Sequence, residues 1–223
     1  MTQTNRKAGE DPLFVVSRIV NKLHSQWLVW TYPFHSVGSE FWAHSSCELS
    51  RSVAPHIKIG DRVKMDRDVC FDIPLIPESD EPVILLEDGC NIGRRCLICA
   101  RNRVQIGKNT VFAPSALVMD HGYAFDDLDA AINHRGATED GSKEGGKIRI
   151  EEGCWIGFRA AIVCSEGELV IGRNSVIGAN SLVTRSIAPY SVVTGNPARV
   201  AMSYDQEEKR WVLGTSQTAT TQG

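Results

Sequence analysis

The most regular feature of the chain is an aliphatic or aromatic residue that returns every six positions, in groups of three. Five such groups lie between residues 59 and 183: Ile59, Met65 and Phe71; Leu86, Ile92 and Ile98; Ile106, Phe112 and Val118; Ile150, Ile156 and Ile162; and Ile171, Ile177 and Val183. A period of six predicts one short strand and one turn per hexapeptide, and three hexapeptides make one triangular coil of about 18 residues.

Stacked coils of this kind would bury one column of aliphatic side chains and pair their strands in parallel, about 4.8 Å apart. Glycine directly follows the repeating residue at six positions, where a turn needs room for the backbone of the next coil. Small or apolar residues recur four positions further on, and these are Val63, Cys90, Cys96, Cys154, Ala160, Ser175 and Ser181. The pattern therefore predicts an all-β parallel coil with a core too narrow for many aromatic side chains.

The repeat is interrupted at a few places. Two extra residues separate Ile98 from Ile106, and three separate Ile162 from Ile171, which predicts small loops at corners of the coil. A polar, glycine-rich excursion, assigned to residues 122–147, has no clear period. Loops of this length in a compact domain are usually functional or disordered.

A different pattern precedes the repeats. Apolar residues at steps of three and four predict an amphipathic helix over residues 12–30, which the Tyr32–Pro33 pair ends. One face carries Leu13, Val16, Val20, Leu23, Trp27 and Trp30. We expect this face to pack against the main domain. A membrane-surface helix is the alternative, although its polar face has few cations.

These patterns divide the chain into three parts. We expect an N-terminal extension with the helix over residues 1–36, a coil domain over 37–200, and a polar, frayed tail over 201–223.

Composition narrows the function classes. Hydrophobic residues make up 42% and charged residues 23%, which excludes a disordered chain, and the apolar stretches fall short of a membrane span. A net charge of −3 gives no basic excess for nucleic acid. The seven cysteines are odd in number and the first ten residues lack a signal-peptide core, so we expect a reduced, cytoplasmic protein. Cys96 and Cys99 form one CxxC with no second pair, and no metal site is expected.

The repeat over residues 57–200 resembles the hexapeptide-repeat acyltransferases. The segment CWIGFRAAIVCSEGELVIGRNSVIGANSLVTRSIAPYSVVTGNPARV, residues 154–200, is similar to the C-terminal signature of maltose, galactoside and exopolysaccharide O-acetyltransferases. This resemblance implies a left-handed parallel β-helix, a homotrimer, acetyl-CoA as co-substrate and a sugar or glycan as acceptor.

The resemblance also implies a catalytic histidine at the junction between a coil and the long loop, which here is His121. Imidazole exchanges protons near neutral pH and can act as a general base towards a hydroxyl. His134, in the excursion, is the rival. Asp120 could orient the imidazole or the acceptor; because adjacent strand residues point to opposite faces, we expect the orienting partner to come from another coil.

Two further residues match acceptor-side positions of the similar enzymes. Asn102 lies about one coil earlier on the same side, with a left-handed corner or an asparagine ladder as the alternative. Trp155 is predicted to face outwards, lining the groove for the coenzyme arm, or to pack between subunits.

The coenzyme would lie in a groove between subunits. Small residues at Gly157, Ala160 and Ala179 would let its pantetheine arm approach the backbone. Thr184, Arg185 and Arg199 match family positions near the adenosine and its phosphates, and the guanidinium fork suits phosphate. Residues 195–197 are predicted mainly to form a turn, with ligand contact as a secondary role.

The predicted reaction is direct transfer of an acyl group, expected to be acetyl, from coenzyme A to a sugar hydroxyl, with His121 as base. Three alternatives stay open: a cysteine nucleophile, a non-catalytic scaffold or targeting trimer, and a γ-type carbonic anhydrase, for which the histidine spacing is poor. Membrane contact is expected only through the N-terminal helix or a lipid-linked acceptor, and the sequence does not name that acceptor.

Overall fold

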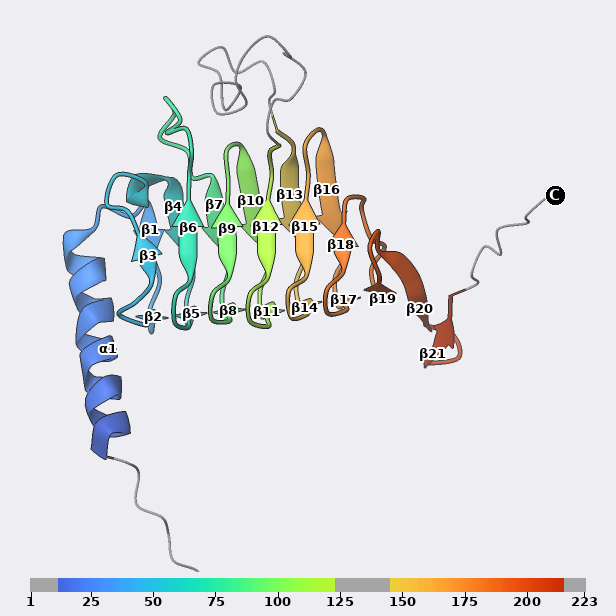
Figure 1. The fold of residues 1–223 in the computed structure, drawn as a ribbon, viewed down its shortest axis with the longest axis horizontal. Coiled ribbons are helices and arrows are strands. Elements are labelled where there is room, and N and C mark those ends of the chain that lie inside the picture. Colours follow the sequence, from blue (N-terminus) through green and yellow to red (C-terminus); the bar gives the residue numbers. More distant parts are fainter. Residues whose placement is uncertain (1–11, 123–144, 215–223) are drawn as a thin grey trace, which may run out of the picture.

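The computed structural model describes residues 12–122 and 145–214, and they form a three-sided parallel coil with a helix at one end (Figure 1). The long α-helix is α1 (Pro12–Thr31), and a 3-10 turn, η1, spans Ala54–His56. The strands fall into three sheets, called A, B and C here. Each coil takes one strand from each sheet in turn, so the sheets are the three faces of a prism.

Sheet A contains β1 (Ser36–Val37), β4 (Ile57–Ile59), β7 (Ile84–Leu86), β10 (Arg103–Ile106), β13 (Lys147–Ile150) and β16 (Glu168–Ile171). Sheet B contains β2 (Trp42–Ala43), β5 (Lys64–Met65), β8 (Asn91–Ile92), β11 (Val111–Phe112), β14 (Trp155–Ile156), β17 (Val176–Ile177), β19 (Ser191–Thr194), β20 (Arg199–Asp205) and β21 (Arg210–Leu213). Sheet C contains β3 (Glu48–Leu49), β6 (Cys70–Asp72), β9 (Leu97–Cys99), β12 (Leu117–Met119), β15 (Ala161–Val163) and β18 (Leu182–Val183).

The six-residue repeat is confirmed as the core of this coil. Every repeating residue from Ile59 to Val183 is at most 3% exposed. Phe112 pairs in register with Ile92 below it and Ile156 above it, so the repeating residues stack into columns. The fold is the predicted left-handed parallel β-helix.

Glycine at the corners is explained by the stacking. A Cβ atom on Gly107 would lie 2.6 Å from the backbone carbon of Glu151 in the next coil, a distance that side chains do not tolerate. The backbones of successive turns meet where the side chain would be, as the sequence pattern predicted.

The three edges of the prism differ in a way that matters for the site. Every connection from sheet A to the next strand of sheet B, and from B to C, is four residues long in the described coils up to β18. The connections from sheet C back to sheet A vary, and they include residues 50–56, 73–83, 100–102, 120–146 and 164–167. All the irregular segments therefore leave from one edge, the C–A edge, and Figure 1 shows the loop after β6 projecting from it.

The prediction for the helix was right in position and wrong in orientation. The side of α1 that meets the first coil carries Asn21, Ser25 and Leu28, which are at most 4% exposed. Ser25 Oγ accepts from Ala43 N at 2.9 Å and donates to Ala43 O at 3.2 Å, while Asn21 Oδ1 accepts from Ser45 N at 3.0 Å. These polar side chains satisfy the open edge of β2, so the apolar side of the helix faces away from the coil.

The coil begins close to the predicted residue 37, ahead of the recognisable repeat, and its C-terminal end extends further than predicted. Strands β1 to β3 form an additional first coil before the repeat becomes recognisable. The expectation of a frayed segment from residue 201 is wrong as far as residue 214, because β20 pairs antiparallel with β19 and with β21. No helix among residues 12–122 and 145–214 is long and apolar enough to cross a bilayer.

Candidate functional site

The candidate site lies on the C–A edge, where β12 ends and the long excursion begins. His121 is the second residue after β12 and is 5% exposed. Its Nδ1 atom lies 3.1 Å from Oδ1 of Asp120, the preceding residue. The rival His134 and most of the 122–147 excursion fall outside the described residues.

Asp120 is held rigidly by the backbone of the previous coil. Its carboxylate accepts hydrogen bonds from the backbone N–H groups of Arg101 at 2.7 Å, and of Asn102 and Arg103 at 2.8 Å each. Together with His121 this makes four donor contacts on a side chain that is fully buried. Acceptance from donors alone is the pattern of an ionised carboxylate.

Two expectations about Asp120 are corrected by this geometry. The partner that orients His121 is the adjacent residue, not one from another coil, because the chain leaves the strand geometry after Met119 and both side chains turn to the same side. Asp120 also cannot contact an acceptor, because its carboxylate is enclosed by the turn of residues 101–103. It is a positioning residue.

Cys99 and Asp72 complete the cluster; the sequence singled out Cys99 only as part of the Cys96–Cys99 pair, and it did not indicate Asp72. Cys99 Sγ donates to Oδ2 of Asp72 at 3.2 Å and lies 3.8 Å from Nε2 of His121. Burial, followed by the hydrogen bond to Asp72 and its negative charge, raises the pKa of the Cys99 thiol to about 12. The thiol is therefore protonated at neutral pH and is a poor nucleophile.

A pair of glycines brings the chain back from the excursion and packs against the cluster. A Cβ atom on Gly145 would clash with the backbone oxygen of Asp120 and lie 2.7 Å from Cβ of His121, and one on Gly146 would clash with Sγ of Cys164. Asn102 Nδ2 donates to the oxygen of Gly146 at 3.2 Å. The Gly-Gly sequence before β13 was the available signal for this contact, and the sequence prediction missed it.

Asn102 lies where the sequence placed it, on the same edge as His121 and one coil earlier, in the turn between β9 and β10. It is not among the described residues with positive φ, so the left-handed corner alternative does not apply. Trp155 is 55% exposed on sheet B, as predicted for an outward side chain. Sheet B does not border the C–A edge, so one chain does not bring Trp155 to His121.

Three of the predicted coenzyme residues come together. Thr184, Arg185 and Arg199 are exposed and line a small cavity of about 30 Å³ beyond the end of β18. This cavity lies on the same C–A edge as His121, two coils further along the stack, which is a distance of about 10 Å. Ala179 is exposed at the corner between β17 and β18.

Two other predicted coenzyme contacts are corrected. Ala160 is fully buried in the core, and its backbone N–H and C=O bond to Gly157 and Leu117 inside the stack. Glycine at position 157 leaves room for the backbone of the next coil, because a Cβ atom there would lie 2.5 Å from the oxygen of Ile177. Both small residues serve the packing of coils and present nothing to a ligand groove.

The remaining cysteines and histidines do not form a second cluster in the described part of the chain. Cys90, Cys96 and Cys154 lie in the core as the repeat predicted, and burial raises their pKa values to about 11 or 12. No group of three or more His, Cys, Asp or Glu side chains in residues 12–122 and 145–214 could hold a metal ion.

Comparison with known proteins agrees with the fold. No protein-family model matches the chain. A protein of Escherichia coli K12, whose name assigns it O-acetyl transfer in lipopolysaccharide biosynthesis, is 27% identical over 130 residues, covering 58% of this chain and 65% of the relative. The galactoside O-acetyltransferase of the same organism is 32% identical over 108 residues, 48% of each chain.

The chain resembles the hexapeptide-repeat sugar acyltransferases. It spans just under two thirds of the first of these relatives and about half of the second. Among solved structures, the N-acyltransferase AntD from Bacillus cereus, in complex with dTDP and 3-hydroxybutyryl-CoA, superimposes with a TM-score of 0.65. It is 17% identical, with 82% of this chain and 90% of that one covered. At this identity the likeness concerns the fold.

Proposed function

We propose that the protein is an acetyl-CoA-dependent O-acetyltransferase that acts on a sugar or glycan hydroxyl, with His121 as the general base. The observation that carries the proposal is the Asp120–His121 pair at the C–A edge. Asp120 accepts a hydrogen bond from the Nδ1–H group of the imidazole, which makes Nε2 the nitrogen that accepts a proton.

In the proposed reaction, His121 Nε2 accepts the hydroxyl proton while the acceptor oxygen forms its bond to the thioester carbonyl carbon. The carbon–sulfur bond then breaks, and the protonated imidazole returns the proton to the departing thiolate. Transfer is direct, since the nearest thiol, Cys99, is held protonated by burial and by Asp72. An oxyanion of this kind is usually met by backbone N–H donors.

The coenzyme is proposed to run along the C–A edge from His121 towards Arg185 and Arg199. Two guanidinium groups around one small cavity suit the phosphates of a nucleotide coenzyme. The cavity and the base lie on one edge, about 10 Å apart, so a single extended molecule can reach both. Thr184 adds a hydroxyl to the same cavity.

The acceptor is proposed to bind among the irregular connections of that edge. The names of the two sequence relatives, in lipopolysaccharide and galactoside acetylation, favour a sugar hydroxyl. Asn102 is proposed to contact the acceptor, since its backbone N–H group hydrogen-bonds Asp120, the neighbour of His121. The loop of residues 73–83 leaves the same edge two coils before His121 and is an additional wall that the repeat pattern did not indicate.

A homotrimer and a cytoplasmic location remain part of the proposal. In a trimer of parallel prisms, sheet B of one protomer can face the C–A edge of another. That arrangement gives Trp155 a place beside the coenzyme of a neighbouring protomer, which a single chain does not.

The decisive experiment measures thiol release from acetyl-CoA with a panel of sugar and glycan acceptors, comparing wild type with His121→Ala. We expect the variant to lose at least about 10²-fold in turnover, the usual contribution of a general base. Unchanged turnover would overturn the assignment of His121.

Coenzyme A titration separates this enzyme from a scaffold that kept only the fold. His121→Ala should bind coenzyme A as wild type does, whereas Arg185→Ala combined with Arg199→Ala should bind it more weakly. Failure of the wild-type protein to bind coenzyme A would favour the scaffold. A metal assay on the purified protein addresses the carbonic anhydrase alternative.

A further inference from the structure

The side of α1 that faces away from the coil carries a continuous apolar surface. Six large side chains form this surface, called the outer face here: Val16, Ile19, Val20, Leu23, Trp27 and Trp30. Each is between 48% and 86% exposed. On a helix with 3.6 residues per turn they lie within an arc of about 100°. A contiguous apolar patch of this size on a folded protein marks an interaction site.

The attachment of α1 fixes the direction of the outer face. Asn21 and Ser25 hydrogen-bond the edge of β2 on the opposite side of the helix, so rotating α1 to bury the outer face would leave those backbone groups unsatisfied. In Figure 1 the N-terminal part of α1 extends beyond the first coil. Residues 12–122 and 145–214 therefore leave the outer face open.

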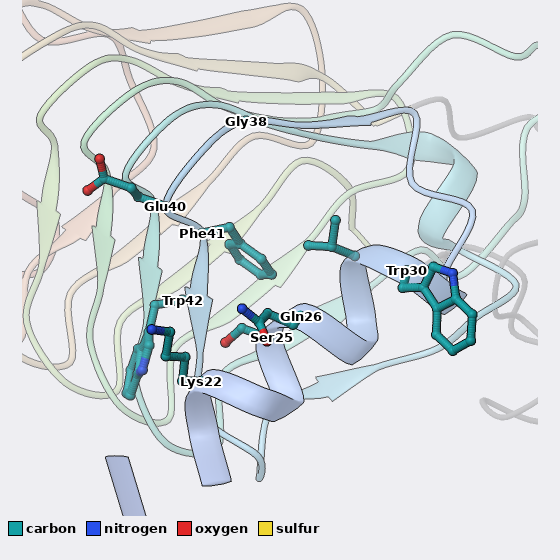
Figure 2. Close-up of a pocket in the computed structure, with 9 residues that line it drawn as sticks. Lys22, Ser25, Gln26, Trp30, Gly38, Glu40, Phe41 and Trp42 are labelled. Atoms are coloured by element: carbon teal, nitrogen blue, oxygen red, sulfur yellow. The ribbon is translucent and has the colours of Figure 1, made fainter. Parts of the chain in front are cut away.

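Figure 2 shows the only large cavity that α1 borders among the described pockets, about 500 Å³ in volume, and it does not cover the outer face. Phe41, Ser25 and Gln26 line it between the helix and the first coil, while the indole of Trp30 lies apart from them. Trp30 is the one residue of the outer face that also lines the cavity, and the other five do not.

The charges on α1 indicate what covers the outer face. Residues 12–31 contain Arg18 and Lys22 and not one Asp or Glu, although the whole chain has a net charge of −3. By helical position Lys22 borders the outer face on one side and His24 on the other. Glu40 is the single acidic residue in the lining of the cavity, and in Figure 2 its side chain lies apart from that of Lys22.

We propose that α1 is a docking helix for an anionic lipid surface, with the outer face inserted at the level of the headgroups. An apolar arc on a helix that carries an arginine and a lysine but no acidic residue fits a helix that lies in the plane of a membrane interface. Trp27 and Trp30 supply the amphipathic rings that favour that depth. A second copy of α1 fits less well, because two such helices would bring their cations together without an acidic partner.

The test is flotation of the purified full chain with vesicles of phosphatidylcholine alone or mixed with phosphatidylglycerol. We expect binding to the mixed vesicles, weaker at high salt. The triple variant Val16→Gln, Val20→Gln, Leu23→Gln should lower the partition coefficient at least about tenfold. Lys22→Gln should weaken binding to the mixed vesicles and leave the residual binding to neutral vesicles unchanged.

The matched control is Trp211→Gln with Leu213→Gln, two exposed apolar residues on the C-terminal hairpin, which should bind vesicles like wild type. Thermal melting checks that each variant is folded, and exposed positions should cost little stability. Absence of vesicle binding by the wild type, or equal loss in the hairpin control, would overturn the proposal. A smaller oligomer in the triple variant by light scattering, with no change in flotation, would assign the outer face to a second copy instead.

Discussion

Nδ1 of His121 lies 3.1 Å from Oδ1 of Asp120, so the residue that orients the imidazole is its own neighbour in the chain. Three backbone N–H groups of the previous coil hold the same carboxylate. The tautomer of the base is thereby set by the stacking of two coils, without a side chain from elsewhere.

Asp120→Asn should disturb the orientation of the His121 imidazole while leaving substrate binding largely intact. The amide cannot accept from all four donors, so the imidazole loses its fixed tautomer, and we expect kcat to fall by about 10² or more while KM changes a few-fold. Steady-state kinetics with a melting curve measures this. Asp72→Asn is the matched control, since it changes charge near the site without a contact to His121. An equal fall in both variants would contradict the role assigned to Asp120.

Experiments on Cys99 distinguish direct acyl transfer from a mechanism with an acyl-cysteine intermediate. With a pKa of about 12, about one thiol in 10⁴ is ionised at pH 8, so Cys99 should resist iodoacetamide in the native protein. Cys99→Ser keeps a donor towards Asp72 and should retain activity within about threefold. Intact-mass measurement after incubation with acetyl-CoA should show no added acetyl group. A stable adduct on Cys99 would establish the cysteine mechanism.

Gly145→Ala should disturb catalysis through the backbone. The new methyl group would meet the backbone oxygen of Asp120 and the Cβ of His121, so the dyad must shift. We expect kcat to fall at least about tenfold with coenzyme binding retained. Gly122→Ala is the control, because its Cβ would meet Ser165 at an ordinary 3.6 Å. Comparable activity in the two variants would show that the dyad tolerates the shift.

Ser25→Ala should lower stability although it removes a single hydroxyl. The change leaves Ala43 N and O without their partner at the edge of β2, which costs about 1–3 kcal/mol of unfolding free energy. For a chain of this size we expect a melting temperature lower by about 2–4 °C per kcal/mol. The neighbouring exposed Gln26→Ala is the control. No difference between them would mean that α1 is attached by other contacts.

The coil could be predicted because one buried residue in every six determines how successive coils pack. Each repeating residue has one environment, a column between two coils, so spacing alone places Ile92, Phe112 and Ile156 correctly. The predicted coil domain began at residue 37, but the repeat does not mark the first coil, because its strands are two residues long and carry polar side chains such as Glu48. Parallel pairing, supplied by the later coils, holds it in place.

The orientation of α1 could not be read in the same way. Periodicity locates the apolar side of a helix, and the usual inference is that this side is buried. Here the orientation of α1 is set by the unpaired backbone groups at the edge of the first coil, to which Asn21 and Ser25 hydrogen-bond. The spacing of Val16 and Val20 contains no information about the unpaired backbone groups at the edge of β2.

The site was predicted in part. The junction histidine and Asn102 were placed on the correct edge because extra residues in the count mark that edge. Cys99 and Asp72 were not found, because they look like ordinary members of the repeat and meet His121 only when two coils are stacked. Ala160 was misassigned since a small residue serves a tight core as well as a ligand groove.

The uneven edges of the prism have a consequence for how such a chain can change over time. Two edges accept four residues per connection and nothing else in the described coils up to β18, so an insertion there would shift the register of every later strand. The C–A edge already holds connections from three residues upwards, and the core is the same beside each of them. New loops can therefore be inserted beside Asp120 and His121 without altering the fold, and under the proposed function this lets acceptor choice diverge while the coil stays fixed.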